Sequence, residues 1–145
     1  MYKQIAALSI LVASTGLASI AVADDKPYKE GAVTDVAWIR IKDGKLNDYM
    51  GYLKGPFKAE MDAQKQAGIV IDYHIFQVEP RSPHDPNLIL TITYPNYAAL
   101  DRTADLDAIS VKVEGSLKAT DQNFADRGTV RKILGSELIQ ELIPK

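Results

Sequence analysis

The chain has 145 residues, of which 46% are hydrophobic and 25% are charged. This length and composition are typical of one globular domain and argue against disordered, collagen-like and repeat-array proteins. Lys and Arg number 17 against 19 Asp and Glu, for a net charge of −2, and no basic block is present, so we expect no nucleic-acid partner. The absence of cysteine excludes disulfides, thiolate nucleophiles and cysteine-ligated zinc.

Residues 1–23 have the pattern of a secretory signal peptide. Lys3 precedes an apolar run that reaches Ala13, and a small-residue stretch ends in Ala21-Val22-Ala23. A membrane anchor is the alternative, but Ser, Thr and Gly interrupt the run, whereas a spanning helix needs about 20 predominantly apolar residues. We therefore expect cleavage after Ala23, a periplasmic or secreted location, and no membrane association of the mature protein.

The mature chain is expected to begin with a flexible lead-in at residues 24–32, followed by a single domain at residues 33–145. Residues 33–42 alternate as a strand does, and Asp43-Gly44 is typical of a turn. A helix is then predicted from Leu46 to Gly68 because its apolar residues recur at intervals of three and four. Pro56 lacks an N–H group, so this helix should kink at Gly55-Pro56.

The second half of the domain repeats this alternation of strands and helices. Residues 69–78 and 88–94 are predicted strands, joined by a proline-rich loop at residues 79–87. Asn96 is suited to cap a helix that opens at Tyr97, and Gly115 divides the helical stripe that follows. Residues 136–143 form the last predicted strand, which is apolar on both faces and is therefore expected to be an inner strand.

The order strand, helix, strand, strand, helix, strand indicates an α+β fold of split βαβ type. Two right-handed crossovers then place both helices on one face of a four-stranded antiparallel sheet. The other face carries four apolar side chains, those of Val36, Trp38, Phe76 and Val78. Such a face is too apolar for a soluble monomer to leave exposed, so we predict a homodimer formed through this sheet face.

Two segments resemble dimeric α/β-barrel proteins, which have a ferredoxin-like βαββαβ fold. The first runs from Ile41-Lys42-Asp43-Gly44-Lys45 into Leu46-Asn47-Asp48-Tyr49, and the second is the strand and helix start at residues 90–101. The resemblance covers residues 33–143 and implies two sheets packed into a barrel. Proteins of this kind include cofactor-free mono-oxygenases, haem-degrading enzymes, lactone isomerases and stress-responsive proteins. Several of these enzymes carry a His early in the second helix, where residues 98–105 here have none.

The first candidate site lies on the sheet face that the helices leave free. His74 and Asp72 are neighbours on one strand face, and a carboxylate beside an imidazole suits general acid-base catalysis, with Arg40 to bind an anion. The alternative interpretation is a polar patch in the dimer interface, with Trp38 as an anchor. This second interpretation is favoured.

The second candidate site is the space between the helices and the sheet. Phenol groups there could hydrogen-bond a small carbonyl compound or pack on an aromatic ring, although tyrosines are also ordinary core residues. The candidate ligand-binding residues of the barrel interior and of this space are Trp38, Tyr49, Tyr52, Tyr73, Phe76 and Tyr94. The sequence does not distinguish between the two locations.

Two functional hypotheses follow from these residues. The preferred one is an exported dimer that binds a small apolar or aromatic molecule or serves as a non-catalytic scaffold. The alternative is a cofactor-independent mono-oxygenase or isomerase that acts on a small aromatic or carbonyl compound. Whether the protein is an enzyme is left open. No cofactor and no metal site are expected, since the motifs of nucleotide-binding proteins, serine hydrolases and zinc proteases are missing from the sequence.

Overall fold

The computed structural model describes residues 25–145, and the predicted signal peptide lies outside them. The strands are β1 (Tyr28–Ile41), β2 (Asp72–Gln77), β3 (Leu88–Tyr94) and β4 (Arg131–Pro144). The helices are α1 (Leu46–Tyr52), α2 (Lys58–Gln66), α3 (Thr103–Glu114) and α4 (Leu117–Arg127). A π-helical turn, η1 (Leu53–Phe57), joins α1 to α2, and a 3-10 helix, η2 (Tyr97–Asp101), precedes α3. Within this part of the chain no helix is long and apolar enough to cross a membrane.

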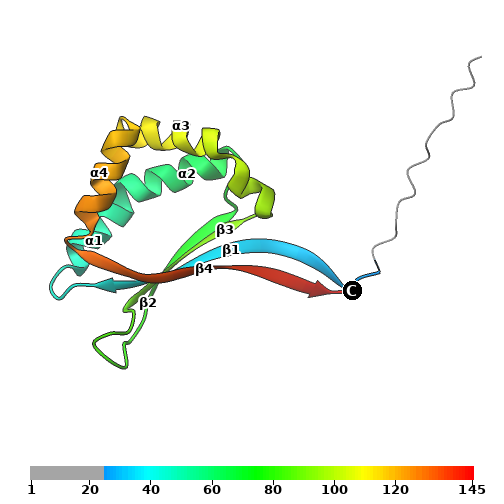
Figure 1. The fold of residues 1–145 in the computed structure, drawn as a ribbon, viewed down its shortest axis with the longest axis horizontal. Coiled ribbons are helices and arrows are strands. Elements are labelled where there is room, and N and C mark those ends of the chain that lie inside the picture. Colours follow the sequence, from blue (N-terminus) through cyan, green and yellow to red (C-terminus); the bar gives the residue numbers. More distant parts are fainter. Residues whose placement is uncertain (1–24) are drawn as a thin grey trace, which may run out of the picture.

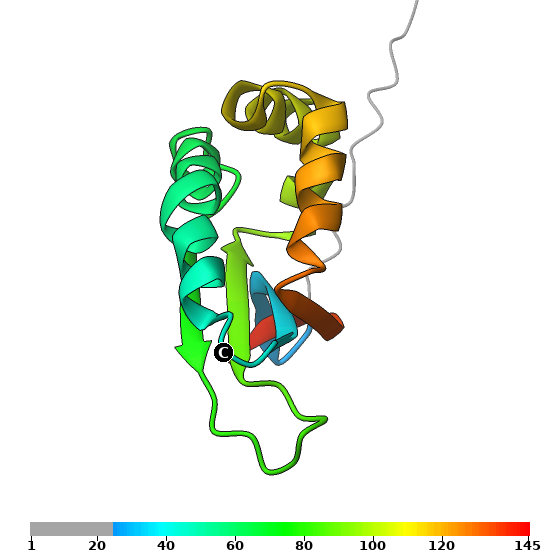
Figure 2. The same ribbon diagram turned by 90° about the vertical axis from the view of Figure 1, so that its left-hand side faces the viewer.

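The strands form one antiparallel sheet in the order β2-β3-β1-β4. All helices lie on the same side of this sheet (Figure 1). Figure 2 shows that α1 and α2 stand over the β2–β3 side, whereas α4 stands over the β1–β4 side. The α+β class, the split βαβ order and the single helical layer predicted from the sequence are therefore confirmed.

The main core lies where α1, η1 and α2 cover the sheet. Tyr49, Leu53 and Phe57 contact the strand residues Ile39 and Ile41, and each of these side chains is at most 5% exposed. Pro56 falls inside η1, where Gly55 has non-helical backbone angles, so the predicted kink is confirmed. A second cluster joins the end of the first crossover to the start of the second; its members are Ile69, Val70, Tyr94 and Ala99.

The second crossover covers the sheet less completely than its sequence pattern predicts. The Asn96 side chain caps η2 by accepting from the Ala99 N–H group, and Gly115 separates α3 from α4, as expected. However, α3 and α4 contain no buried hydrophobic residue, and Leu117 and Phe124 of the apolar stripe are 50% and 54% exposed. The reason is that α3 and α4 pack chiefly on α2 and on each other.

The first residues of β1 and β4, and the place of β4 in the sheet, differ from the prediction. β1 begins at Tyr28, so most of the expected lead-in belongs to the sheet, and its first residues pair only with the end of β4. β4 begins at Arg131, because Gly135 lies at a β-bulge opposite Trp38 rather than before the strand. β4 is also an edge strand and not an inner one. Leu138 and Ile139, which lie on its two faces, are 45% and 49% exposed within the protomer.

Candidate functional site

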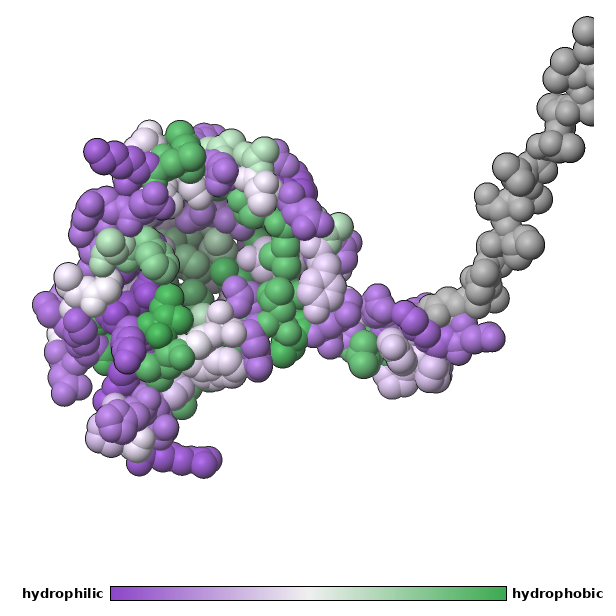
Figure 3. All heavy atoms as spheres, in the orientation of Figure 1, coloured by the Kyte–Doolittle hydropathy of each residue, from purple (hydrophilic) through white to green (hydrophobic). Residues whose placement is uncertain are grey.

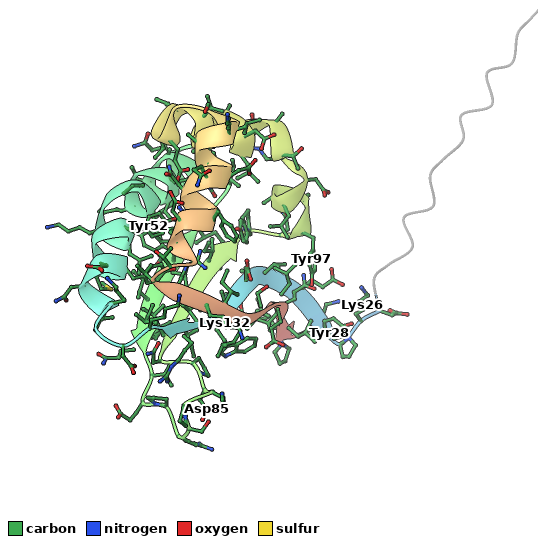
Figure 4. The ribbon with its side chains drawn as sticks, turned by 60° about the vertical axis from the view of Figure 1, so that its left-hand side comes forward. Lys26, Tyr28, Tyr52, Asp85, Tyr97 and Lys132 are labelled. Carbon is green, nitrogen blue, oxygen red and sulfur yellow. The ribbon has the colours of Figure 1, made fainter. Side chains whose placement is uncertain are left out.

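The strand pairing assigns each predicted site residue to one of the two sheet faces. Trp38, Arg40, Asp72, His74 and Phe76 point to the helix-free face. The four predicted ligand-binding tyrosines belong to the opposite side, where Tyr49, Tyr52, Tyr73 and Tyr94 contribute to the packing between helices and sheet. In Figure 4, Tyr52 lies among the helices, whereas Asp85 lies in the loop beyond the far side of the sheet. The six predicted ligand-binding residues thus form two separate sets.

On the helix-free face the structure brings Asp72 and His74 together. His74 Nε2 lies 3.4 Å from Asp72 Oδ2, and both side chains are about half exposed, at 57% and 48%. Hydrogen bonds from Lys65 Nζ and from the Tyr73 N–H group hold the pKa of Asp72 below its ordinary value. Asp72 is therefore an anion whose carboxylate lies beside the imidazole.

Arg40 is not part of this pair. It lies on β1, which β3 separates from β2, and its position is four residues from Val36, the β1 residue in line with His74. Its guanidinium donates instead to the Asp85 carbonyl oxygen at 3.2 Å. The pairing places Arg40 in contact with the β2–β3 loop and not beside Asp72 and His74.

A cleft opens on the opposite side, between the β4 half of the sheet and the helices. Ile133 and Leu138 face the helices, yet they are 39% and 45% exposed, and Phe124 of α4 is 54% exposed. The space-filling view shows this hollow, with hydrophobic residues along it (Figure 3). We call it the helix–sheet cleft. It offers an apolar surface that the protomer does not fill.

One end of the helix–sheet cleft is acidic. Asp35 occupies a helix-facing position of β1, where it pairs with Ile92 and Leu138 and lies diagonally across from Tyr94. Burial raises the pKa of Asp35, and within residues 25–145 no ion pair neutralises this carboxyl group. Glu60 of α2 is the second acid, and its Oε1 accepts hydrogen bonds from Ser110 Oγ at 2.7 Å and from Gln64 Nε2 at 3.4 Å.

The phenols near these acids stay protonated. Burial raises the pKa of Tyr94 to about 12, and the charges of Asp35 and Glu60 act in the same direction. Burial likewise raises the pKa of Tyr52 to about 12, although the nearby Arg127 guanidinium opposes it. Both phenols are therefore neutral hydrogen-bond donors at any physiological pH, which suits recognition of a carbonyl oxygen.

The other end of the cleft is basic and aromatic. The Arg127 guanidinium lies 4.2 Å from the centre of the Tyr52 ring and 3.7 Å from Glu114, whose side chain is 3% exposed. Arg131 lies 5.5 Å from the Tyr49 ring centre and is 7% exposed. Both arginines also approach the Phe124 ring, at 5.5 and 5.2 Å. Buried arginines on aromatic faces are typical of sites that recognise planar groups.

Sequence reasoning missed the charged residues of the cleft. Asp35 stands among Val33, Ala37 and Ile39 in an otherwise apolar strand face, and this interruption was a usable signal. Arg127 and Arg131 gave no such signal, because an arginine at a helix end or a strand start is ordinary in sequence. Their burial depends on the crossing of α4 over β4.

The fold has counterparts among solved structures. HapK from Hahella chejuensis aligns with a TM-score of 0.51 and 12% identity, over 75% of this chain and 91% of HapK. A dimeric ferredoxin-like protein from an uncultured marine organism aligns with a TM-score of 0.52 and 12% identity, over 79% and 96% of the two chains. The chain has the ferredoxin-like fold. A protein from Shewanella oneidensis has this arrangement too, at a TM-score of 0.51 and 19% identity over 80% and 98% of the chains.

These similarities concern the backbone, and they confirm the ferredoxin-like fold that the sequence segments suggested. No family model and no curated protein matches the chain. A ferredoxin-like fold supports many unrelated activities, so the function must be argued from the residues of the site.

Proposed function

We propose that the protein is a homodimer, formed through the helix-free sheet face, that binds a small aromatic or apolar molecule in the helix–sheet cleft of each protomer. The observation that carries the binding proposal is the uncovered apolar surface of the cleft beside neutral phenols. A mostly apolar hollow with a few polar groups is the usual form of a small-molecule site.

The dimer is supported by the composition of the other face. Phe76 and Ile139 are 50% and 49% exposed there, next to the half-buried Trp38 and Val36. Two structural neighbours are described as dimeric ferredoxin-like proteins. A second copy is the occupant that covers the same apolar face on both partners at once.

Leu138 and Ile139 allow the two parts of the proposal to be tested separately. They are adjacent on β4, point to opposite faces and are 45% and 49% exposed. We expect Leu138→Gln to weaken binding of the neutral fluorescent probe N-phenyl-1-naphthylamine several-fold while the dimer persists. Ile139→Gln should weaken the dimer in sedimentation and leave probe binding unchanged.

Either part can fail by itself. A wild-type protein that does not bind the probe would refute the binding proposal, and so would equal effects of the two substitutions on the probe. A wild-type monomer at micromolar concentration would refute the dimer. Matched variants are useful here because they differ by one position and not in chemistry.

A second candidate function is the cofactor-independent isomerisation of a carbonyl compound. Asp35 supports it, because a half-buried carboxyl group with a raised pKa next to a phenol donor suits removal and return of a proton beside a carbonyl group. His74 with Asp72 stays the sequence-based candidate for the same role, on the opposite face.

Proton exchange distinguishes these two bases without knowledge of the substrate. We expect the wild-type protein to catalyse deuterium exchange beside the carbonyl group of 2-tetralone in D₂O, followed by NMR. Loss of exchange in Asp35→Asn but not in His74→Gln places the base in the cleft, and the reverse places it on the sheet face. No catalysed exchange in the wild type contradicts the enzymatic hypothesis.

We further propose that the protein acts after export, on the evidence of residues 1–23 alone. The N-terminal sequence of the protein purified from its host should then begin at Asp24. An intact N-terminal segment on the purified protein would contradict this.

A further inference from the structure

The basic end of the helix–sheet cleft contains an arginine whose charge the protein does not neutralise. Arg131 is the first residue of β4, pairs with Ile41 and faces the helices. It is 7% exposed, and its Nε atom is buried without a hydrogen-bond partner. Its surroundings are the rings of Tyr49 and Phe124, and a guanidinium stays protonated at any physiological pH.

Neighbouring charges do not compensate Arg131. Within residues 25–145 no carboxylate forms an ion pair with it, since the buried Glu114 pairs with Arg127 at 3.7 Å and accepts from Asn123 at 3.3 Å. Arg127 also has a buried Nε atom without a partner. Two guanidiniums thus approach the Phe124 ring, and only Arg127 of the two is paired with a carboxylate among the described residues.

A buried guanidinium without an anionic partner destabilises the folded protein. A buried charge needs a partner of opposite sign, and its removal from water is otherwise unfavourable. The Tyr49 phenol forms a side-chain hydrogen bond with Arg131 but brings no negative charge, because burial raises the pKa of Tyr49 in spite of this bond and of the two arginine charges. The missing element is an acceptor that carries negative charge.

The position of Arg131 connects this charge to the cleft. Ile133, the next helix-facing residue along β4, is 39% exposed. Phe124, whose ring centre lies 5.2 Å from the Arg131 guanidinium, is 54% exposed. A flat apolar body that lies between these two side chains directs one end at Arg131. The exposed Phe124 ring can turn aside without disturbing the buried core.

A second route to the arginines, through a pocket between α1 and α4, is unfavourable for an anion. A pocket of about 470 Å³ between α1 and α4 reaches Arg127 and Tyr52, but Asp48, Glu114 and Asp126 also line it. Lys45 pairs with Asp48 and Arg127 pairs with Glu114, so Asp126 leaves this wall with net negative charge. An anionic ligand therefore approaches Arg131 from the side of the sheet.

We propose that the ligand of the helix–sheet cleft is a small aromatic or planar carboxylate whose anionic group pairs with Arg131 while its ring lies against Phe124 and Ile133. This inference rests on the proposed binding function and specifies its ligand class. Arg127 adds positive charge nearby, because its guanidinium lies 5.5 Å from the Phe124 ring centre. Arginine suits the role because its fork of donors matches the two oxygens of a carboxylate.

The test uses two probes that differ only in one substituent, which is an anionic carboxylate in one and a neutral amide in the other. 2-Naphthoate and 2-naphthamide have the same ring system and nearly the same shape, and calorimetry measures the affinity of each. We expect the wild-type protein to bind naphthoate at least tenfold more tightly, which corresponds to one charge-assisted hydrogen-bonded pair. This preference requires no variant, so it does not depend on how a substitution affects folding.

Two substitutions on the same strand locate the effect. Arg131→Met should abolish the preference for naphthoate while binding of naphthamide persists. Lys132→Met removes the same charge from the neighbouring residue, which is exposed and faces away from the helices, and it should leave the preference intact. Arg131→Lys should retain part of it, because the charge stays but the fork is lost.

The outcomes separate this inference from the function on which it rests. If neither compound binds, the cleft is not a small-molecule site and both proposals fail. If both bind equally to the wild type, the binding function stands and the anion site is refuted. A preference that Arg131→Met leaves unchanged, or that Lys132→Met removes, places the recognition of charge outside the cleft and also refutes it.

Discussion

Phe76 provides a quantitative test of the dimer. It is 50% exposed in the protomer, on the helix-free face of β2. A phenylalanine side chain buries on the order of 200 Å², so about 100 Å² is left for a partner to cover. At about 25 cal/mol per Å², the covered area contributes about 2.5 kcal/mol in each copy. A twofold-symmetric interface contains the residue twice, so Phe76→Ser should cost about 5 kcal/mol of association free energy.

Sedimentation equilibrium over a range of protein concentrations measures this loss. A change of about 5 kcal/mol raises the dimer dissociation constant by more than three orders of magnitude. Phe124→Ser is the matched control, because Phe124 is the same residue with 54% exposure but lies on α4, in the helical layer. The reasoning is refuted if the two variants dissociate alike, or if Phe76→Ser leaves the dimer unchanged.

Three further predictions concern stability, and chemical denaturation measures each of them. The pKa of Asp35 is raised from 3.8, so its ionisation lowers the free energy of unfolding as the pH rises above 3.8. Asp35→Asn should therefore match the wild type at lower pH and be more stable at neutral pH. A variant that is less stable at neutral pH contradicts this. Gly68 has a φ angle of +67°, so Gly68→Ala should lower the free energy of unfolding by about 1 kcal/mol. Gly51→Ala inside α1 should raise the free energy of unfolding by up to about 1 kcal/mol. Equal effects of the two substitutions would refute the conformational argument. The Asn87 side chain accepts from the Ile41 N–H group at 2.7 Å and donates to its carbonyl oxygen at 3.0 Å, so Asn87→Ala should cost about 2 kcal/mol; a neutral effect would show that water replaces both bonds.

Local patterns in the sequence predict most of the fold. β3 occupies the predicted residues 88–94, and the kink at Pro56 and the division at Gly115 are where backbone chemistry requires them. Such features depend on residues close together in the chain. The strand pairing follows in turn from the order of the elements and the handedness of their crossovers.

The position of β4 in the sheet could not be read from its pattern. Leu138 and Ile139 make both faces apolar, which is typical of an inner strand, but β4 lies at the edge. Hydrophobicity indicates that a face avoids water without saying whether the same chain covers it. In this protein one face borders the cleft and the other belongs to the proposed dimer interface.

The candidate site was predicted only in part. The tyrosines were assigned to the helix side correctly, whereas the charges that give the cleft its chemistry were overlooked. Arg131 is part of a candidate site because Phe124 of α4 and Tyr49 of α1 lie beside it, and these residues approach it only in the folded chain. Long-range contacts of this kind do not follow from periodicity.

The exposed edge of β4 affects how the protein must assemble. Alternate residues of this fourteen-residue strand direct their backbone groups to its outer edge, flanked by apolar side chains that are 39–54% exposed. An open edge of this kind recruits any extended chain, so a newly folded protomer that waits alone is at risk of forming fibrous aggregates. Rapid pairing with a correct partner would cover the apolar side chains on one flank of this edge and so reduce aggregation, and dilution during refolding would slow both pairing and aggregation.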